Sequence, residues 1–403
     1  FPPTAWRLVH YEDTSTQMVA LNIVYDVGAR DEHPEHTGFA HLFRASDVRR
    51  FGAYSRLRYA FAVGGGENNA WTNNDITNYY LTVPKPNVET AFWLESDRML
   101  ELAFSEQSLE VQRGVVMEEF SNAALTSRMA MWGICSGRWR SGCIRTAGYY
   151  RQGTLAHRAS HAGRGEEFLL SFLCSEQCRV GSDGKHSWDE TVKLTEKWFA
   201  PIPRRDVPVR QLPQEPEQTQ ERRLTVERNV PLDALFMGYH MCSREGADYY
   251  AFDILSDILS NGRSSRLNRR LVQEQNIFSG IDAYISGSVM AGLLQISGKP
   301  AAGVSLEQAE AAPKELEELQ RSPVDGQELE KVKNKFESTQ IFGNINYLNV
   351  ATNLAWFELT GKAEDIDLEV ERYRSVTTEQ LHTVAQRTFC ESNAVVLYYK
   401  SDK

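Results

Sequence analysis

The sequence predicts an α+β protein made of two homologous domains with antiparallel β-sheets, and three observations support this. Its 403 residues are enough for two domains of ordinary size, each with its own core. Strand-like segments followed by helical segments occur twice in the same order. Between the two series, residues 201–223 carry five prolines and many charges without any periodicity, which is typical of a linker. We therefore predict a first domain at 1–212, a linker at 213–223 and a second domain at 224–403.

In the first half, alternating apolar residues and β-branched or aromatic side chains predict the strands, and apolar residues at helical spacing predict the helices. The expected strands are 6–10, 18–27 and 75–83, and the expected helices are 88–102, 107–120 and 188–199. The second half repeats this order. Its expected strands are 224–230, 234–240, 277–286, 293–297 and 394–399, and its expected helices are 248–259, 265–275, 306–320, 325–359, 365–373 and 378–389.

Composition narrows the class of protein. An apolar content of 41% and a charged content of 24% are typical of a soluble globular chain, and no apolar run is long enough to span a bilayer. The net charge of −10 argues against nucleic acid as the main partner. The first four residues lack the charged and apolar regions of a signal peptide. No targeting segment is predicted, and the compartment, cytoplasm or periplasm, stays open.

Two stretches depart from this composition. Residues 44–63 hold five Arg and one Asp, a net charge of +4. Residues 121–186 hold eight Arg and one Lys against four acids, a net charge of +5, together with four of the six cysteines. Neither stretch shows the periodicity of a helix or strand, so we expect both to pack poorly.

Residues 37–43 carry the candidate chemistry. A helix with the pattern His-x-x-Glu-His presents two imidazoles on one face that hold Zn²⁺, and its carboxylate takes a proton from zinc-bound water. This chain supplies His41 at the first position. Arg44 occupies the place of the general-base Glu, and Ala45 occupies the place of the second His. As written, the motif offers one imidazole and a cation.

Five segments together resemble the pitrilysin or insulinase type (M16) of zinc metallopeptidases, the family of insulin-degrading enzyme and the mitochondrial processing peptidase. The segments occur in the family's order and cover the chain apart from the two anomalous stretches. They are residues 27–41, with Val-Gly-Ala-Arg-Asp-Glu and Thr-Gly-Phe-Ala-His; 65–79, with Gly-Gly-Glu-Asn-Asn-Ala-Trp-Thr and Asp-x-Thr-x-Tyr; 95–99, Glu-Ser-Asp-Arg-Met; 113–119, Arg-Gly-Val-Val-Met-Glu-Glu; and 264–267, Ser-Ser-Arg-Leu.

The resemblance implies the fold of LuxS and the processing peptidases. Each of two homologous domains would be a six-stranded, mostly antiparallel sheet with helices packed on one side. The resemblance also implies that His41 and Glu119 are zinc ligands, and that Asn69 and Ala70 lie on an edge strand that pairs with the substrate backbone. The substrate would be a peptide or small protein. The chain would form half of a clam-like chamber, paired with itself or with a paralogous subunit.

The pair Arg44-Ala45 conflicts with catalysis, since two ligands and a cation cannot hold a catalytic zinc. One hypothesis is a family member that lost its chemistry and serves as a non-catalytic partner subunit. The other is a shifted reading frame, either in the gene or in the recorded sequence. One base added before codons for Glu-His-Leu-Met-Phe-Gly-Gly, the family's continuation, yields residues 44–50 in order. A similar shift yields residues 121–130, and the family pattern resumes after each stretch. We favour the shift, which also accounts for the excess of Arg and Cys.

Overall fold

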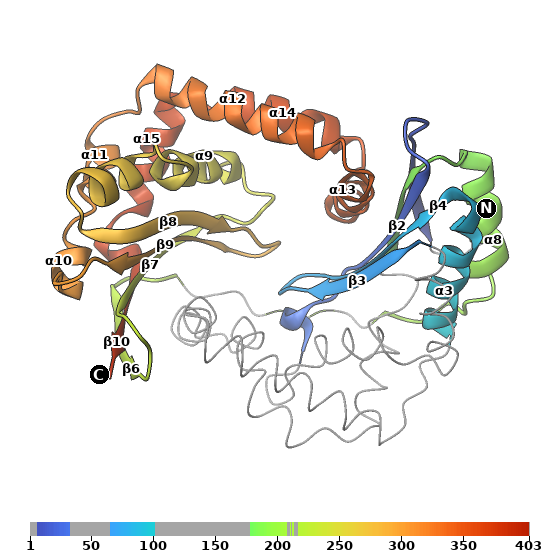
Figure 1. Cartoon of the computed structure of the whole chain (residues 1–403), viewed down its shortest axis with the longest axis horizontal. Coiled ribbons are helices and arrows are strands. Elements are labelled where there is room, and N and C mark those ends of the chain that lie inside the picture. Colours follow the sequence, from blue (N-terminus) through green and yellow to red (C-terminus); the bar gives the residue numbers. More distant parts are fainter. Residues whose placement is uncertain are drawn as a thin grey trace. The chain divides into compact units, whose positions relative to one another are not determined.

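In the computed structural model of the chain (Figure 1), the structure describes residues 6–32, 65–100, 178–207, 210, 212 and 217–402. The chain folds into two compact units. The first contains the described residues as far as Leu212 and also takes in Gln340–Leu368 from the C-terminal half. The second contains those of Pro213–Thr339 and Glu369–Lys403. Both units combine a sheet with helices, which confirms the predicted α+β class.

The first unit is built on a five-stranded sheet in the order β1-β5-β2-β4-β3. Its strands are β1 (Arg7–Glu12), β2 (Met18–Tyr25), β3 (Glu67–Thr72), β4 (Thr77–Pro84) and β5 (Cys178–Gly184). β1 and β5 are parallel, and the other neighbours are antiparallel. Ile23 at the centre of β2 lies opposite Tyr79 on one side and Val180 on the other.

The second unit repeats this topology with the order β6-β10-β7-β9-β8. Its strands are β6 (Arg222–Arg228), β7 (Ala234–Met241), β8 (Phe278–Ser286), β9 (Gly292–Pro300) and β10 (Ala394–Ser401). Again the first pair, β6 and β10, is parallel and the rest are antiparallel. The identical strand order confirms the predicted duplication. Each sheet has five strands among the described residues, where the resemblance implies six.

Both faces of the first sheet are covered by helices. The helices α3 (Val88–Leu100) and α8 (Trp188–Phe199) pack on the face that presents Leu21 and Ile23. The helix α13 (Tyr347–Thr360) lies on the opposite face, where Val24 packs against Ala355 (Figure 1). A helix from the C-terminal half of the sequence therefore completes the core around the N-terminal sheet.

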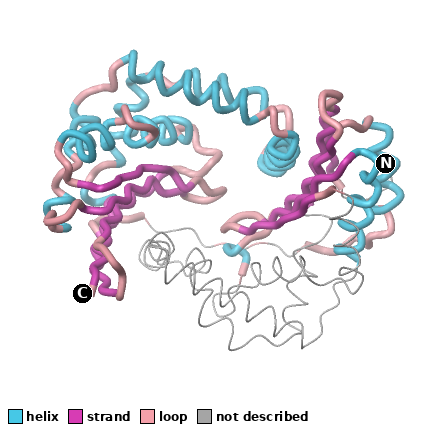
Figure 2. Tube along the Cα trace, viewed as in Figure 1, coloured by secondary structure: helices cyan, strands magenta, loops and turns pink. Residues whose placement is uncertain are grey.

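The second unit places its main core between the sheet and a group of helices. Most of these helices lie above β8 and β9 in the view of Figure 2. They are α9 (Tyr249–Ser260), α10 (Leu306–Glu310), α11 (Lys314–Arg321), α12 (Gly326–Gly343), α14 (Asp365–Ser375) and α15 (Thr378–Thr388). The core joins Met237 and Ile296 of the sheet to Leu255 and Leu381 of the helices. A smaller cluster around Phe236 lies on the other face.

Three predicted helices differ from the observed ones. The predicted helix at 325–359 is two helices, because the chain turns after α12 and Asn346 caps α13 by accepting the Leu348 amide at 2.9 Å. The predicted helix at 306–320 is interrupted before α11 at Pro313, which lacks an amide hydrogen. The segment predicted as a helix at 265–275 contains a π-helix, η6 (Asn268–Glu274).

β5 corrects part of the expectation for residues 121–186. Its seven residues form an inner strand of the sheet, and Cys178, Val180 and Ser182 are fully buried. The expectation of poor packing is therefore wrong for this strand, which the ladders to β1 and β2 hold in place. The described residues do not include 44–63, the predicted helix at 107–120 or residues 121–177. None of the described helices combines the length and apolar character that crossing a bilayer requires.

Candidate functional site

The strand β3 stands at the end of the first sheet and pairs with β4 among the described residues. Its side chains alternate, so that Ala70 is buried while Asn69 and Trp71 are exposed. The Ala70 amide donates a hydrogen bond to the Asn69 side-chain oxygen at 2.8 Å. The two residues expected to contact a substrate backbone thus lie together at this end strand.

The turn between β3 and β4 is held by the segment that follows β2. The amides of Ala29 and Arg30 donate to the carbonyl oxygens of Asn73 and Asn74 at 3.1 and 3.0 Å. Gly28 permits this approach, because a Cβ atom there would lie 2.5 Å from the backbone of Asn74. The sequence motif around Gly28 and the strand-turn motif after β3 are therefore in direct contact.

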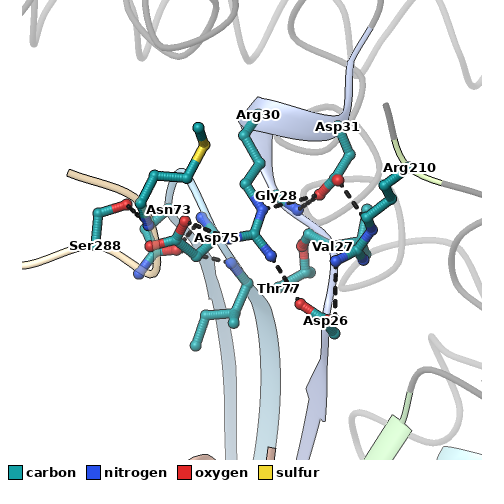
Figure 3. A network of polar contacts seen from close by, with 12 residues as sticks. Asp26, Val27, Gly28, Arg30, Asp31, Asn73, Asp75, Thr77, Arg210 and Ser288 are labelled. Carbon is teal, nitrogen blue, oxygen red and sulfur yellow. Dashed lines mark hydrogen bonds and ion pairs between the residues drawn. The ribbon is translucent and has the colours of Figure 1, made fainter. Parts of the chain in front are cut away.

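A network of charges surrounds this contact, and we call it the Arg30 hub (Figure 3). Arg30 donates to Asp75 at 2.8 Å and to Asp26 at 2.9 Å. Arg210, near the end of the predicted first domain, donates to Asp26 at 2.8 Å and makes a charge contact with Asp31 at 3.1 Å. The hub joins the end of β2, the short helix η1 (Ala29–Asp31), the β3–β4 turn and the chain at residue 210.

Asp31 is the most perturbed acid of the hub. Burial raises its pKa to about 6, although the guanidinium groups of Arg210 and Arg30 and the Gly28 amide favour the ionised form. The Gly28 amide donates to the Asp31 carboxylate at 2.9 Å. The Asp31 carboxylate thus holds the start of η1 through this hydrogen bond, and at neutral pH its charge is buried.

A second buried cation lies beneath the sheet. Arg98 of α3 donates to Glu95 at 2.9 Å, and its guanidinium carbon lies 3.7 Å from the centre of the Tyr79 ring. Tyr25 packs beside it, and burial raises the pKa of its hydroxyl well above the ordinary value. The segment at 95–99 that carries part of the resemblance therefore anchors α3 beneath β2 and β4.

A cluster that the sequence did not suggest lies where β5 leads into α8. The Ser182 hydroxyl lies 2.7 Å from His186 Nε2 and 3.4 Å from His10 Nδ1. The two imidazole rings meet edge to face with centroids 4.5 Å apart. Burial lowers the pKa of His186 to about 4, so this ring is neutral at neutral pH. The cluster ties β1 and β5 to the start of α8.

The predicted metal site falls on residues outside the part of the chain that the structure describes. His41, Glu119, Arg44 and Ala45 all lie outside the described residues. Within the ranges that the structure does describe, His, Cys, Asp and Glu form no group of three or more that could hold a metal ion. The chemistry of these four side chains therefore decides whether the site can bind zinc.

Two members of the hub were missed by sequence reasoning. Asp26 directly follows β2, where a polar residue is common, and the neighbouring sequence does not indicate an ion pair. Arg210 stands in the segment 201–223, among its prolines and charges, and its pairing with acids some 180 residues earlier has no local signal. Arg30 and Asp75, in contrast, belong to the motifs that carry the resemblance.

Comparison with known proteins finds two related family models. Residues 7–130 match the model described as insulinase (peptidase family M16), and residues 166–336 match the peptidase M16 inactive domain. Together these matches cover most of the chain and include residues of both units.

Individual relatives match nearly the whole length. An uncharacterized zinc protease of Bacillus subtilis, YmxG, is 22% identical over 97% of this chain and 95% of its own length. The zinc protease PqqE of Helicobacter pylori is 22% identical over 96% of this chain and 89% of its own. Among solved structures, a protease from Helicobacter pylori superposes with a TM-score of 0.89 at 21% identity, covering 99% and 98% of the two chains.

Proposed function

The chain belongs to the peptidase M16 family, and from this premise we propose that it binds extended peptides along β3 but, as its sequence stands, does not hydrolyse them. One observation carries the first half of the proposal. β3 is the last strand in the order of the described sheet, and the Ala70 amide donates a hydrogen bond to the exposed side chain of its neighbour, Asn69.

A peptide can add to such a strand by backbone pairing. The carbonyl oxygen of an incoming strand would replace Asn69 Oδ1 on the Ala70 amide, and this exchange of one hydrogen bond for another is nearly neutral in energy. The rest of the affinity would come from further backbone pairs and from side chains beside Trp71. The Arg30 hub holds the β3–β4 turn, so the edge is fixed before the peptide arrives.

The donor set argues against zinc chemistry in the chain as written. Family members named zinc proteases imply Zn²⁺, which takes three protein ligands in a catalytic site. Of the residues in this sequence, His41 and Glu119 supply two, while Arg44 and Ala45 supply none. Arg44 also brings a positive charge to the place of the general base. The donor set does not fit the metal, and no catalytic step is assigned to it.

A non-catalytic partner subunit is the alternative to a damaged enzyme, and both share the same peptide edge. Two measurements distinguish these alternatives: the reading frame of the translated protein and its oligomeric state. The intact mass of the purified protein decides whether residues 44–63 and 121–186 are translated as recorded. Sedimentation velocity then tests the dimer, with itself or with a paralogous chain, that the family resemblance implies.

Peptide binding is tested with a fluorescein-labelled decapeptide of alternating Val and Thr. Ala70→Pro removes the amide hydrogen that would meet the peptide and should weaken binding at least about tenfold. Ala70→Gly keeps that hydrogen and is the matched control. Equal binding by the wild type and the proline variant would show that β3 is not the peptide edge.

Metal binding is tested by equilibrium dialysis with Zn²⁺. The chain as written should bind no stoichiometric zinc and cleave no casein. Restoring the frame through 44–63 should recover Glu and His at positions 44 and 45 and, with them, zinc binding. Glu119→Gln in a fully restored chain should then lower the metal affinity by removing a charged ligand. Chelator-sensitive cleavage by the unrestored chain would refute the proposal.

A further inference from the structure

The strand β8 of the second unit occupies the same place in its sheet that β3 occupies in the first. Each stands last in the strand order, and each pairs with the strand before it in that order. The sequences also correspond, since Asn69-Ala70-Trp71 in β3 matches Asp282-Ala283-Tyr284 in β8 in both position and character. β8 is therefore the natural candidate for a second strand-accepting edge.

The backbone of Ala283 is already occupied on its outer side. The Ala283 amide donates to the Ser260 hydroxyl at 2.6 Å, and the same hydroxyl donates to the Ala283 carbonyl oxygen at 2.8 Å. Ser260 is the last residue of α9, which packs along β8. One side chain thus satisfies the donor and the acceptor of a single strand residue.

This pair of bonds reproduces what an added strand would supply. In an antiparallel ladder, alternate residues of an edge strand turn both their amide hydrogen and their carbonyl oxygen outward. Ala283 lies opposite Ile296 in β9, and its bonds to Ser260 show that it is one of these outward residues. Ser260 therefore stands where the backbone of a facing strand would stand.

The two edges differ in what would have to move. At β3, the Ala70 amide donates to the Asn69 side chain, which is exposed and belongs to the strand itself. At β8, the group is a hydroxyl on a helix whose neighbouring residues, Ile258 and Leu259, are buried in the core. A peptide strand at this place would need the space of the Ser260 backbone, and moving that backbone would pull Ile258 and Leu259 from the core.

We propose that Ser260 is a built-in cap that closes β8, so that an extended peptide adds to β3 and not to β8. The cap is a segment of this chain acting in place of a strand, a known way in which proteins protect a sheet edge. The half that concerns β3 rests on the proposed function, whereas the closure of β8 stands independently of it. The duplicated fold would then contain one peptide edge, although it contains two edge strands of the same design.

The cap is tested by amide hydrogen exchange on the full chain. Ser260→Ala should speed exchange of the Ala283 amide about tenfold, the effect of losing one hydrogen bond. Ser256→Ala is the matched control, because the Ser256 hydroxyl donates within α9 to the Asp253 carbonyl oxygen and not to the backbone of Ala283. Amides of the inner strand β7 report whether each variant is folded. An unchanged Ala283 rate in a folded Ser260→Ala protein would overturn the proposal.

The alternating Val and Thr decapeptide completes the test. In the wild type it should slow exchange along β3 and leave the amides of Ile281 and Ile285 in β8 unchanged. Slower exchange at Ile281 or Ile285 would show that β8 is open and would overturn the cap. Absence of any effect at β3 would instead refute the proposed function, while the Ser260→Ala result would still decide whether β8 is closed.

Discussion

Replacing Arg30 with Met tests whether the Arg30 hub stabilises the first unit. The side chains of Arg30 and Asp75 are only 7% and 4% exposed and lie 2.8 Å apart, and Arg30 also contacts Asp26. Methionine preserves much of the volume but leaves a buried carboxylate without this cation. Breaking a buried ion pair by removing one partner costs about 3–5 kcal/mol, so R30M should destabilise the first unit by that order.

Arg7→Met is the control, since Arg7 pairs with Glu358 at 3.1 Å but its side chain is 58% exposed. An exposed pair of this kind contributes about 0–1 kcal/mol. The assay is hydrogen exchange of the β2 and β4 amides in increasing urea, which reports the first unit separately from the second. If R30M lowers the opening free energy by no more than R7M does, the hub does not hold the β3–β4 turn.

Three further predictions concern packing and pH. Gly181→Ala should cost about 1–3 kcal/mol of stability in urea unfolding, because its Cβ would lie 2.2 Å from the Ala351 carbonyl oxygen of α13, whereas Gly280→Ala meets no atom within 4 Å. Because the pKa of Asp31 is raised from 3.8 to about 6, its contribution to folding stability is fully present below pH 3.8 and is lost as the pH rises through 6. Asp31→Asn should therefore remove this loss of stability, measured as the urea unfolding midpoint at a series of pH values. The lowered pKa of His186, about 4, has the opposite sign: stability is present above 6.5 and falls as the pH drops toward 4, and His186→Gln should flatten this acid limb.

The sequence predicted most elements of the fold because their own patterns decide them. The helix α8 was expected at 188–199 and is observed with these bounds, since its capping Ser187 and apolar spacing are local signals. β2, β7 and β10 were found because their alternation and β-branched residues mark strands. The duplication followed from the order of these elements alone.

Features that depend on distant partners were not predicted. β5 has too few apolar residues to be recognised as a strand, and its position follows from the ladders that β1 and β2 offer it. The break between α12 and α13 was missed because the apolar spacing continues through it. For the candidate site, Asn69 and Ala70 were predicted through the resemblance, whereas the cap on β8 depends on a contact between Ser260 and a strand 23 residues later.

β5 provides one observation against the frame-shift hypothesis, its packing, and one in favour of it, its buried polar residues. Its counterpart β10 is an apolar strand with Val396 and Leu397 at its centre, as an inner strand normally is. In the second half of β5 stand Ser182 and Asp183, both buried, and burial raises the pKa of Asp183 to about 7. The strand packs, contrary to our expectation, but it carries buried polar groups that an inner strand selected for its position would not need.

The contacts of the hub determine how the frame-shift hypothesis can be tested cleanly. The chain before residues 44–63 and the chain after them meet where the Ala29 amide bonds Asn73 and Arg30 bonds Asp75. Both ends of the anomalous stretch are thus tied together by residues outside it. Restoring the frame between them changes the metal donors while leaving these contacts in the sequence. If the restored chain gains zinc and the β3 amides exchange as before, the metal site and the peptide edge are separable features of the first unit. If the β3 amides change with the restoration, residues 44–63 help to form the edge itself, and the hub alone does not fix it.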